Sequence, residues 1–216
     1  MSQLHLLFDL DGTLTDSRPG ILASMRHALT SLGLTVPADE ALSRLIGPPT
    51  HDAFRQLLHS SDPELNARAI AIYRERYSTL GLFESSLYPG ISQGLKKLRD
   101  ADISLLVVTS KPEVYATTII DHFELRQYFG HVYGSELNGD RSNKGALIAH
   151  VLASEGISQA RAWMIGDRLH DVLGAKQNGL RSAGVLWGYG SRVELGDAGA
   201  DTLFQTMPEL VSAFSS

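Results

Sequence analysis

The sequence predicts an α/β fold, with a doubly wound parallel sheet as its core and an inserted α-helical cap domain. From residue 86 onwards, short apolar segments of strand length alternate with helical segments. This alternation is typical of right-handed crossovers in a parallel sheet that is covered on both faces. Residues 16–85 interrupt it, because they contain helical patterns and no convincing strand. We therefore predict a core of residues 1–15 and 86–216 and a cap of residues 16–85.

The first part of the chain contains one predicted strand and several helices. Residues 3–8 form the strand, since an apolar run of strand length ends there. A helix is predicted from Ser17 to Gly33, because Pro19 suits a first turn and apolar residues follow at helical spacing. Prolines and glycines separate three further predicted helices, around 38–46, 50–60 and 63–80.

The second part supplies the remaining strands of the predicted sheet. These segments are apolar and do not alternate, as expected for strands buried on both faces. They are predicted at 103–108, 131–133, 162–165, 183–187 and 202–204. The helices are predicted from Pro89-Gly90, at 112–122, 143–155 and 170–178, and from Pro208.

The composition is that of a globular protein of 216 residues with a net charge of −5 and no cysteine. The acidic balance argues against a nucleic-acid polymer as partner, since such proteins present a basic face. The missing cysteine excludes disulfides and thiolate metal sites. No apolar run reaches about eighteen residues and no secretory signal is found, so we expect no membrane span and a cytoplasmic location. A monomer and a homodimer both remain open.

Two carboxylates directly follow the first strand. Asp9 and Asp11 stand two positions apart in Phe-Asp-Leu-Asp-Gly-Thr, residues 8–13. Residues two apart in an extended chain point the same way, so both acids can face one pocket. Burying carboxylates is costly unless they are paired, hydrogen-bonded or bound to a cation. The pattern predicts a metal ligand, a nucleophile and an acid/base within three residues, and the alternative is a plain turn after a strand.

Hydroxyls, lysine and further acids follow the other strands. Thr109 and Ser110 follow the second core strand, Lys144 opens a helix after the third, and Asp167 follows the fourth with Asp171 four residues on. Ligands in open α/β sheets bind beyond the carboxyl ends of the strands. We therefore expect these side chains to share one pocket with the two N-terminal carboxylates.

This combination of residues indicates phosphoryl transfer. A phosphate ester repels an attacking carboxylate, because two unit charges ~4 Å apart interact by ~4 kcal/mol at an effective dielectric of ~20. Mg²⁺ on carboxylate oxygens, together with Lys144, would offset that repulsion. Asp9 could then attack phosphorus, and Asp11 could protonate the leaving oxygen and later activate water. Thr109 and the amides of 110–112, where a helix is expected to begin, would bind phosphate oxygens.

Four segments resemble, in the right order, the motifs of the haloacid dehalogenase superfamily of phosphohydrolases. They are Asp-Leu-Asp-Gly-Thr at 9–13, the strand ending in Thr109, Lys144, and Gly-Asp-Arg-Leu-His-Asp at 166–171. The insert after the first motif is similar to the subgroup with a small helical cap, which includes phosphoglycolate phosphatase, β-phosphoglucomutase and related nucleotidases. The stretch 134–144 resembles a phosphoglycolate-phosphatase-like branch often labelled 5′-nucleotidase. The resemblance implies a Rossmann-like core.

The resemblance also implies a role for each of the two N-terminal acids. Asp9 is then the nucleophile, which forms an aspartyl phosphate, and a Mg²⁺ ligand. Asp11 is the general acid/base and gives its backbone carbonyl to the metal.

The remaining site residues divide into phosphate and metal ligands. Thr109, Lys144 and, beside them, Ser110 are expected to bind phosphate, and Asp167 is the main metal carboxylate of the last motif. Asp171 is either a water-bridged metal contact or a residue that orients Lys144, although an acid in the first turn of a helix is also favoured for structural reasons.

Several residues keep a structural alternative. Ser110 and Glu113 fit a capping box, so Ser110 could only cap the next helix. Lys111 is expected to be solvated or to face the substrate. The loop 47–51 either covers the substrate or merely connects two helices, and 188–190 is expected to be a mobile loop at the pocket rim.

The sequence thus predicts a Mg²⁺-dependent phosphatase that acts on a small organic phosphate monoester, with a small phosphorylated metabolite as its partner. Two rivals remain open. A sugar phosphomutase would keep both N-terminal acids and differ in the cap, and a catalytically silent relative would bind a phosphorylated ligand without turnover. The substrate itself is not predicted, because specificity is expected to reside in residues 16–85.

Overall fold

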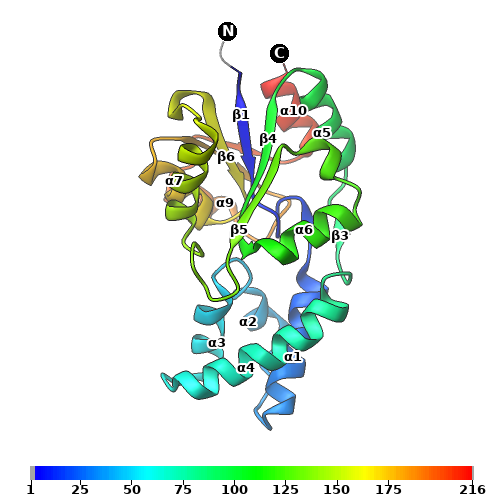
Figure 1. Ribbon diagram of the computed structural model, residues 1–216, viewed down its shortest axis with the longest axis vertical. Coiled ribbons are helices and arrows are strands. Elements are labelled where there is room, and N and C mark those ends of the chain that lie inside the picture. The colour runs from blue at the N-terminus through cyan, green and yellow to red at the C-terminus, as the bar shows by residue number, and fades with distance from the viewer. Residues whose placement is uncertain (1–2, 216) are drawn as a thin grey trace.

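The computed structural model describes residues 3–215 and contains a six-stranded parallel sheet with helices on both faces (Figure 1). The strand order is β5-β4-β1-β6-β7-β8. The strands are β1 (His5–Phe8), β4 (Ser104–Pro112), β5 (His131–Ser135), β6 (Ala162–Gly166), β7 (Arg181–Val185) and β8 (Thr202–Phe204). From β1 the chain adds strands first on one side and then on the other, so the predicted doubly wound α/β fold is confirmed.

Helices cover the two faces of this sheet. They are α5 (Ile91–Asp100), α6 (Glu113–His122), α7 (Lys144–Glu155), α8 (Leu169–Gln177), α9 (Arg192–Ala198) and α10 (Met207–Phe214), with short 3₁₀ turns η2 (Arg126–Tyr128) and η3 (Gln159–Arg161). Successive side chains of β1 point to opposite faces. Leu6 accordingly packs in a cluster with Leu95 of α5 and Ile119 of α6, whereas Leu7 packs in a second cluster with Ile148 of α7 and Ala175 of α8.

A group of helices lies at the end of the molecule away from the N-terminus (Figure 1). It comprises α1 (Arg18–Ser31), α2 (Asp39–Ser43), α3 (Thr50–Leu58), α4 (Pro63–Arg76) and the π-helix η1 (Tyr77–Gly81). The chain enters and leaves this group through β2 (Thr15–Asp16) and β3 (Ser86–Leu87), which pair antiparallel. No helix within residues 3–215 has the length and apolarity needed to cross a membrane.

The segment after Thr109 differs from its predicted form. Strand β4 continues to Pro112, which pairs with Ser135, and α6 begins only at Glu113. Proline disfavours a helical conformation in the residue before it, which explains why Lys111 stays extended. The N-cap is Pro112 and no side chain caps the helix. Both the helix cap assigned to Ser110 and the helix start at 110–112 were therefore wrong.

Three further differences concern element lengths. Helix α2 contains five residues, fewer than the predicted 38–46, and α4 changes into a π-helix at Tyr77. Strand β7 begins at Arg181, two residues before its predicted start. Helix α9 was not predicted, although Ser191 does accept a hydrogen bond from the Glu194 amide at its N-terminus. That Ser-x-x-Glu spacing is a helix-start signal in the sequence.

Candidate active site

The ends of three adjacent strands bring predicted site residues together. Asp9 directly follows β1, Thr109 lies in β4, and Asp167 directly follows β6. Strands β4 and β6 are the two neighbours of β1 and run parallel to it. Their carboxyl ends therefore meet at one edge of the sheet. This edge is the topological switch point, where ligands bind in doubly wound sheets.

Three buried carboxylates and one lysine form the centre of this edge. Asp9, Asp167 and Asp171 each offer an oxygen within 4.8 Å of the others. The Lys144 ammonium lies 2.9 Å from Asp9 Oδ1 and 2.8 Å from Asp171 Oδ1. It also donates a hydrogen bond to the Val108 carbonyl at 2.9 Å.

The electrostatics of this cluster require more positive charge than Lys144 supplies. Burial raises the pKa of Asp167 well above its ordinary value, and the neighbouring Asp171 and Asp9 carboxylates raise it further. Burial also raises the pKa of Asp171, although Lys144 opposes the shift. Burial alone would lower the pKa of Lys144, but Asp171 and Asp9 outweigh it and raise that pKa. Carboxylates 4.8 Å apart repel each other by roughly 3–4 kcal/mol at an effective dielectric of ~20. A divalent cation on these oxygens would remove that repulsion.

Two hydrogen bonds and a close glycine turn fix the position of the Asp167 carboxylate. Thr13 Oγ1 donates to Asp167 Oδ1 at 3.2 Å, and the Tyr189 amide donates to Oδ2 at 2.8 Å. Gly12 has a φ of +84°, and a Cβ atom there would lie 2.2 Å from Asp167 Oδ2. The turn after β1 therefore needs glycine both for its backbone conformation and for the space it leaves.

The loop 188–190 is attached rather than free at the pocket rim. The Tyr189 hydroxyl accepts a hydrogen bond from the Ser17 amide at 2.9 Å and donates to Asp16 Oδ1 at 3.1 Å. Together with its amide on Asp167, this residue connects the start of the helical group with the end of β6. These contacts do not fit the mobile loop expected from the glycines.

Asp171 makes the contacts of two of the roles left open for it, a residue that orients Lys144 and an acid in the first turn of a helix. Its Oδ1 pairs with Lys144, and its Oδ2 accepts a hydrogen bond from the Arg168 amide at 3.1 Å, which caps α8. The Arg168 side chain pairs with Glu194 at 2.8 Å and donates to the carbonyl of Ile46 in the helical group. No pattern in the sequence indicated the contact between Arg168 and Ile46.

Asp11 lies apart from the carboxylate cluster and has its own lysine. Its Oδ2 is 2.9 Å from the Lys111 ammonium. Lys111 is buried, with 9% of its surface exposed, so the first of its two expected positions, in solvent, was wrong. It lines the same pocket as Asp9 and Asp11, so the second, facing the substrate, stays a prediction. It also donates to the hydroxyl of Tyr77, the first residue of η1. Asp11 Oδ1 is buried and has no hydrogen-bond partner among residues 3–215.

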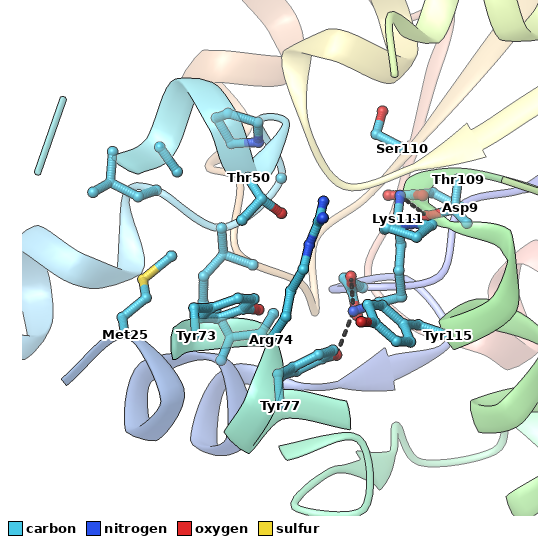
Figure 2. Close-up of a pocket in the computed structure, with 18 residues that line it drawn as sticks. Asp9, Met25, Thr50, Tyr73, Arg74, Tyr77, Thr109, Ser110, Lys111 and Tyr115 are labelled. Atoms are coloured by element: carbon cyan, nitrogen blue, oxygen red, sulfur yellow. Dashed lines mark hydrogen bonds and ion pairs between the residues drawn. The ribbon is translucent and has the colours of Figure 1, made fainter. Parts of the chain in front are cut away.

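A small pocket lies between the sheet edge and the helical group (Figure 2). Its volume is about 60 Å³, and Asp9, Asp11 and Thr109 line it from the sheet side. Thr50 and Arg74 line it from the other side. Gly47 and Pro48 of the loop before α3 also border the pocket, and the covering of a substrate by residues 47–51 stays a prediction.

A larger cavity of about 570 Å³ lies between helices α3 and α4 and the loop 135–142. The residues that line both cavities are Thr50, Arg74, Ser110 and Pro112. The Arg74 guanidinium donates to the Leu137 carbonyl at 2.6 Å, which holds it at the boundary between the two cavities. We call them the inner pocket and the outer cavity.

Lys144 does not line the inner pocket. It borders a third cavity of about 360 Å³, which also contacts Ser110, Asn143 and His170. Ser110 therefore lines all three cavities, whereas Lys144 contacts Asp9 from the side of the third cavity and not from the inner pocket. The predicted phosphate-binding roles of Thr109, Ser110 and Lys144 stay predictions.

Comparisons with known proteins agree with these motifs. The family described as haloacid dehalogenase-like hydrolase matches residues 6–185. A 5′-nucleotidase from Pseudomonas aeruginosa is 44% identical over 88% of this chain and 86% of its own length. Tyrosine-protein kinase PtkA from Mycobacterium tuberculosis is 42% identical over 86% of this chain and 62% of its own length.

The fold comparison agrees as well. The crystal structure of a predicted phosphatase from Clostridium acetobutylicum has a TM-score of 0.93 and 39% sequence identity, and 98% of each chain is covered. The predicted enzyme class, a phosphoric monoester hydrolase, is confirmed by the family and these likenesses, and the chain belongs to the haloacid dehalogenase-like hydrolases.

Proposed function

We propose that this protein is a Mg²⁺-dependent phosphatase that hydrolyses a small organic phosphate monoester through an aspartyl phosphate on Asp9. The proposal rests on one observation: the Asp9 carboxylate lies between a buried lysine, a carboxylate cluster and an open pocket. Lys144 holds Asp9 Oδ1, which leaves the other oxygen available for attack on phosphorus.

The donor set of the cluster fits Mg²⁺, which prefers carboxylate oxygens and keeps several waters. Asp9, Asp167 and Asp171 would hold the ion, with the Asp11 carbonyl as a further ligand. When bound, the ion would neutralise charge on the phosphoryl oxygens. Thr109 and Ser110 would donate hydroxyl hydrogen bonds to the same oxygens, since both line the inner pocket.

Asp11 would handle the protons. It donates one to the leaving oxygen as Asp9 attacks, and it later takes one from the water that opens the aspartyl phosphate. We propose that residues 16–85 act as a cap over this chemistry, because α4 and the loop before α3 close the inner pocket on the side away from the sheet.

The two cavities support a leaving group of sugar or nucleoside size. At ~10–15 Å³ for each water-sized group, the inner pocket of about 60 Å³ holds roughly four to six such groups, enough for a phosphoryl group and little more. The outer cavity of about 570 Å³ falls within the usual range for small-molecule sites. Its lining includes Asp52, Glu136 and Asp140 against the single cation Arg74, which disfavours an anionic leaving group such as glycolate.

The test is a substrate panel with the purified protein and Mg²⁺. Nucleoside monophosphates and phosphate esters of neutral sugars should give a higher kcat/KM than phosphoglycolate. All release of phosphate should vanish in Asp9→Asn. An unchanged rate in Asp9→Asn with a generic aryl phosphate would show that the proposed chemistry is wrong. Equal kcat/KM across the panel would leave the chemistry intact and contradict the assigned leaving group.

The fate of the phosphoryl group separates this function from its rivals. Free phosphate indicates hydrolysis, an isomerised sugar phosphate indicates a mutase, and transfer to an added tyrosine peptide would match the name of the mycobacterial relative. Calorimetric binding of phosphate and Mg²⁺ without any turnover would indicate the silent alternative.

A further inference from the structure

Lys111 connects the helical group to Asp11 through buried contacts. Its ammonium lies 2.9 Å from Asp11 Oδ2, donates to the Tyr77 hydroxyl and sits 4.6 Å from the centre of the Tyr77 ring (Figure 2). The side chains of Lys111 and Asp11 are 5% and 13% exposed. Buried charges are found in pairs, and this pair is separate from the one that Lys144 makes.

Packing fixes the Tyr77 end of this connection. Tyr77 is 1% exposed, stacks on Tyr73 with ring centres 5.2 Å apart, and meets the edge of Tyr115 at 5.7 Å. It starts a π-helix, a local form that is frequent at functional sites. The rings of Tyr73 and Tyr115 thus hold the ring of Tyr77, whose hydroxyl positions the Lys111 ammonium.

The Asp11 end has one occupied and one free oxygen. Oδ2 belongs to Lys111, whereas the buried Oδ1 has no partner within the described chain. A buried acceptor without a partner costs free energy, and such groups need an explanation. Asp11 lines the inner pocket, so a water or leaving oxygen in that pocket would be a partner for Oδ1.

We propose that Lys111, held by Tyr77, is a positioning residue that orients Asp11 so that Oδ1 accepts the proton of the water that hydrolyses the aspartyl phosphate. The inference rests on the proposed phosphatase function. In this step the water oxygen bonds to phosphorus, the bond from phosphorus to the Asp9 oxygen breaks, and a water proton moves to Asp11 Oδ1. The products are free phosphate and the Asp9 carboxylate, and the proton on Asp11 passes to the leaving oxygen of the next substrate.

The test uses 4-nitrophenyl phosphate, whose leaving group needs little help from an acid. For this substrate kcat/KM reports formation of the aspartyl phosphate, and kcat reports its hydrolysis when that step is slow. Lys111→Met removes the charge and keeps the length of the side chain. A positioned acid/base contributes a factor of ~10²–10⁴ to the rate. We expect Lys111→Met to lose part of this factor, so that kcat falls by about tenfold or more. We expect kcat/KM to change by less than about threefold, with a stoichiometric burst of 4-nitrophenol before the slow steady state.

Two further variants make the result decisive. Lys96→Met is the same substitution at an exposed lysine that pairs with Asp100, and it should leave both constants unchanged. Tyr77→Phe keeps the ring and removes the oxygen that holds Lys111, so it should show a smaller fall in kcat with the same burst. It also decides the question if Lys111→Met does not fold.

The outcomes separate this inference from the proposed function. If kcat and kcat/KM fall together without a burst in both variants, or if neither constant changes, Lys111 does not position Asp11 for hydrolysis. That result would leave the phosphatase function standing as long as the unaltered protein releases phosphate and Asp9→Asn does not. Failure of the unaltered protein to release phosphate would overturn both.

Discussion

Replacing Gly12 by alanine should damage the proposed metal site through Asp167. The φ of +84° at Gly12 lies in the left-handed region, which costs a residue with a side chain ~1–2 kcal/mol. The new Cβ would lie 2.2 Å from Asp167 Oδ2, whereas ordinary contacts begin at 3.4 Å. The carboxylate must therefore move by roughly 1 Å, and a displacement of ~1 Å at a reacting centre can cost ~10²-fold in rate.

Gly33→Ala is the matched control. Gly33 also has a positive φ, +69°, and a Cβ there would meet nothing within 4 Å. Both variants should lose ~1–2 kcal/mol of stability, a fall in Tm of about 2–8 °C for a chain of this size. Only Gly12→Ala should also lose ~10²-fold in kcat/KM and need more Mg²⁺ for half-maximal activity. Thermal denaturation and a Mg²⁺ titration of the rate measure these effects. Equal activity and equal Mg²⁺ dependence in the two variants would refute the reasoning.

Three other predictions follow from contacts in the structure. The hydrogen bond from Arg76 lowers the pKa of Glu84. At pH values above the ordinary carboxyl pKa of 4.5, this pair should therefore add up to about 1 kcal/mol to the free energy of unfolding, and this contribution should be lost as the pH falls. Urea denaturation of a Glu84→Gln variant that differs from the unaltered protein by the same amount at all pH values would contradict this. Tyr189→Phe removes hydrogen bonds to Ser17 and Asp16 and should lower the free energy of unfolding by ~1–2 kcal/mol. The hydrogen bond from the Tyr189 amide to Asp167 is kept in this variant. Chelation of divalent ions should lower the Tm, and Mg²⁺ at ~100 times its Kd should restore about 2.7 kcal/mol, so a Tm indifferent to both would argue against a metal site.

The carboxyl edge of the sheet could be predicted from the sequence because strand pairing places it. Each site residue there follows an apolar run, and parallel pairing brings the ends of β1, β4 and β6 together whatever the side chains are. Asp9, Thr109 and Asp167 therefore needed only the positions of three strands. A shift of two residues at the start of β7 does not disturb them, because none of these three residues follows β7.

Contacts between the sheet edge and the helical group could not be predicted in this way. The hydrogen bond from Lys111 to Tyr77 joins residues 34 positions apart, and Arg74 reaches the carbonyl of Leu137, 63 positions away. Such contacts depend on the rotation and tilt of α4 over the sheet, which hydrophobic periodicity does not encode. One local signal was available: the proline after Lys111 favours an extended chain there, which argues against reading 110–113 as a helix start.

The two lysines of the site form ion pairs with three of its four carboxylates, and Asp167 is the carboxylate that neither of them contacts. Lys144 pairs with Asp9 and Asp171, and Lys111 pairs with Asp11. Asp167 is fully buried, and within residues 3–215 its carboxylate receives only a hydroxyl and an amide. A buried carboxylate without a counter-charge is strongly disfavoured, which agrees with the raised pKa of Asp167. A cation held by both Asp167 and Asp9 would supply that counter-charge in the proposed function.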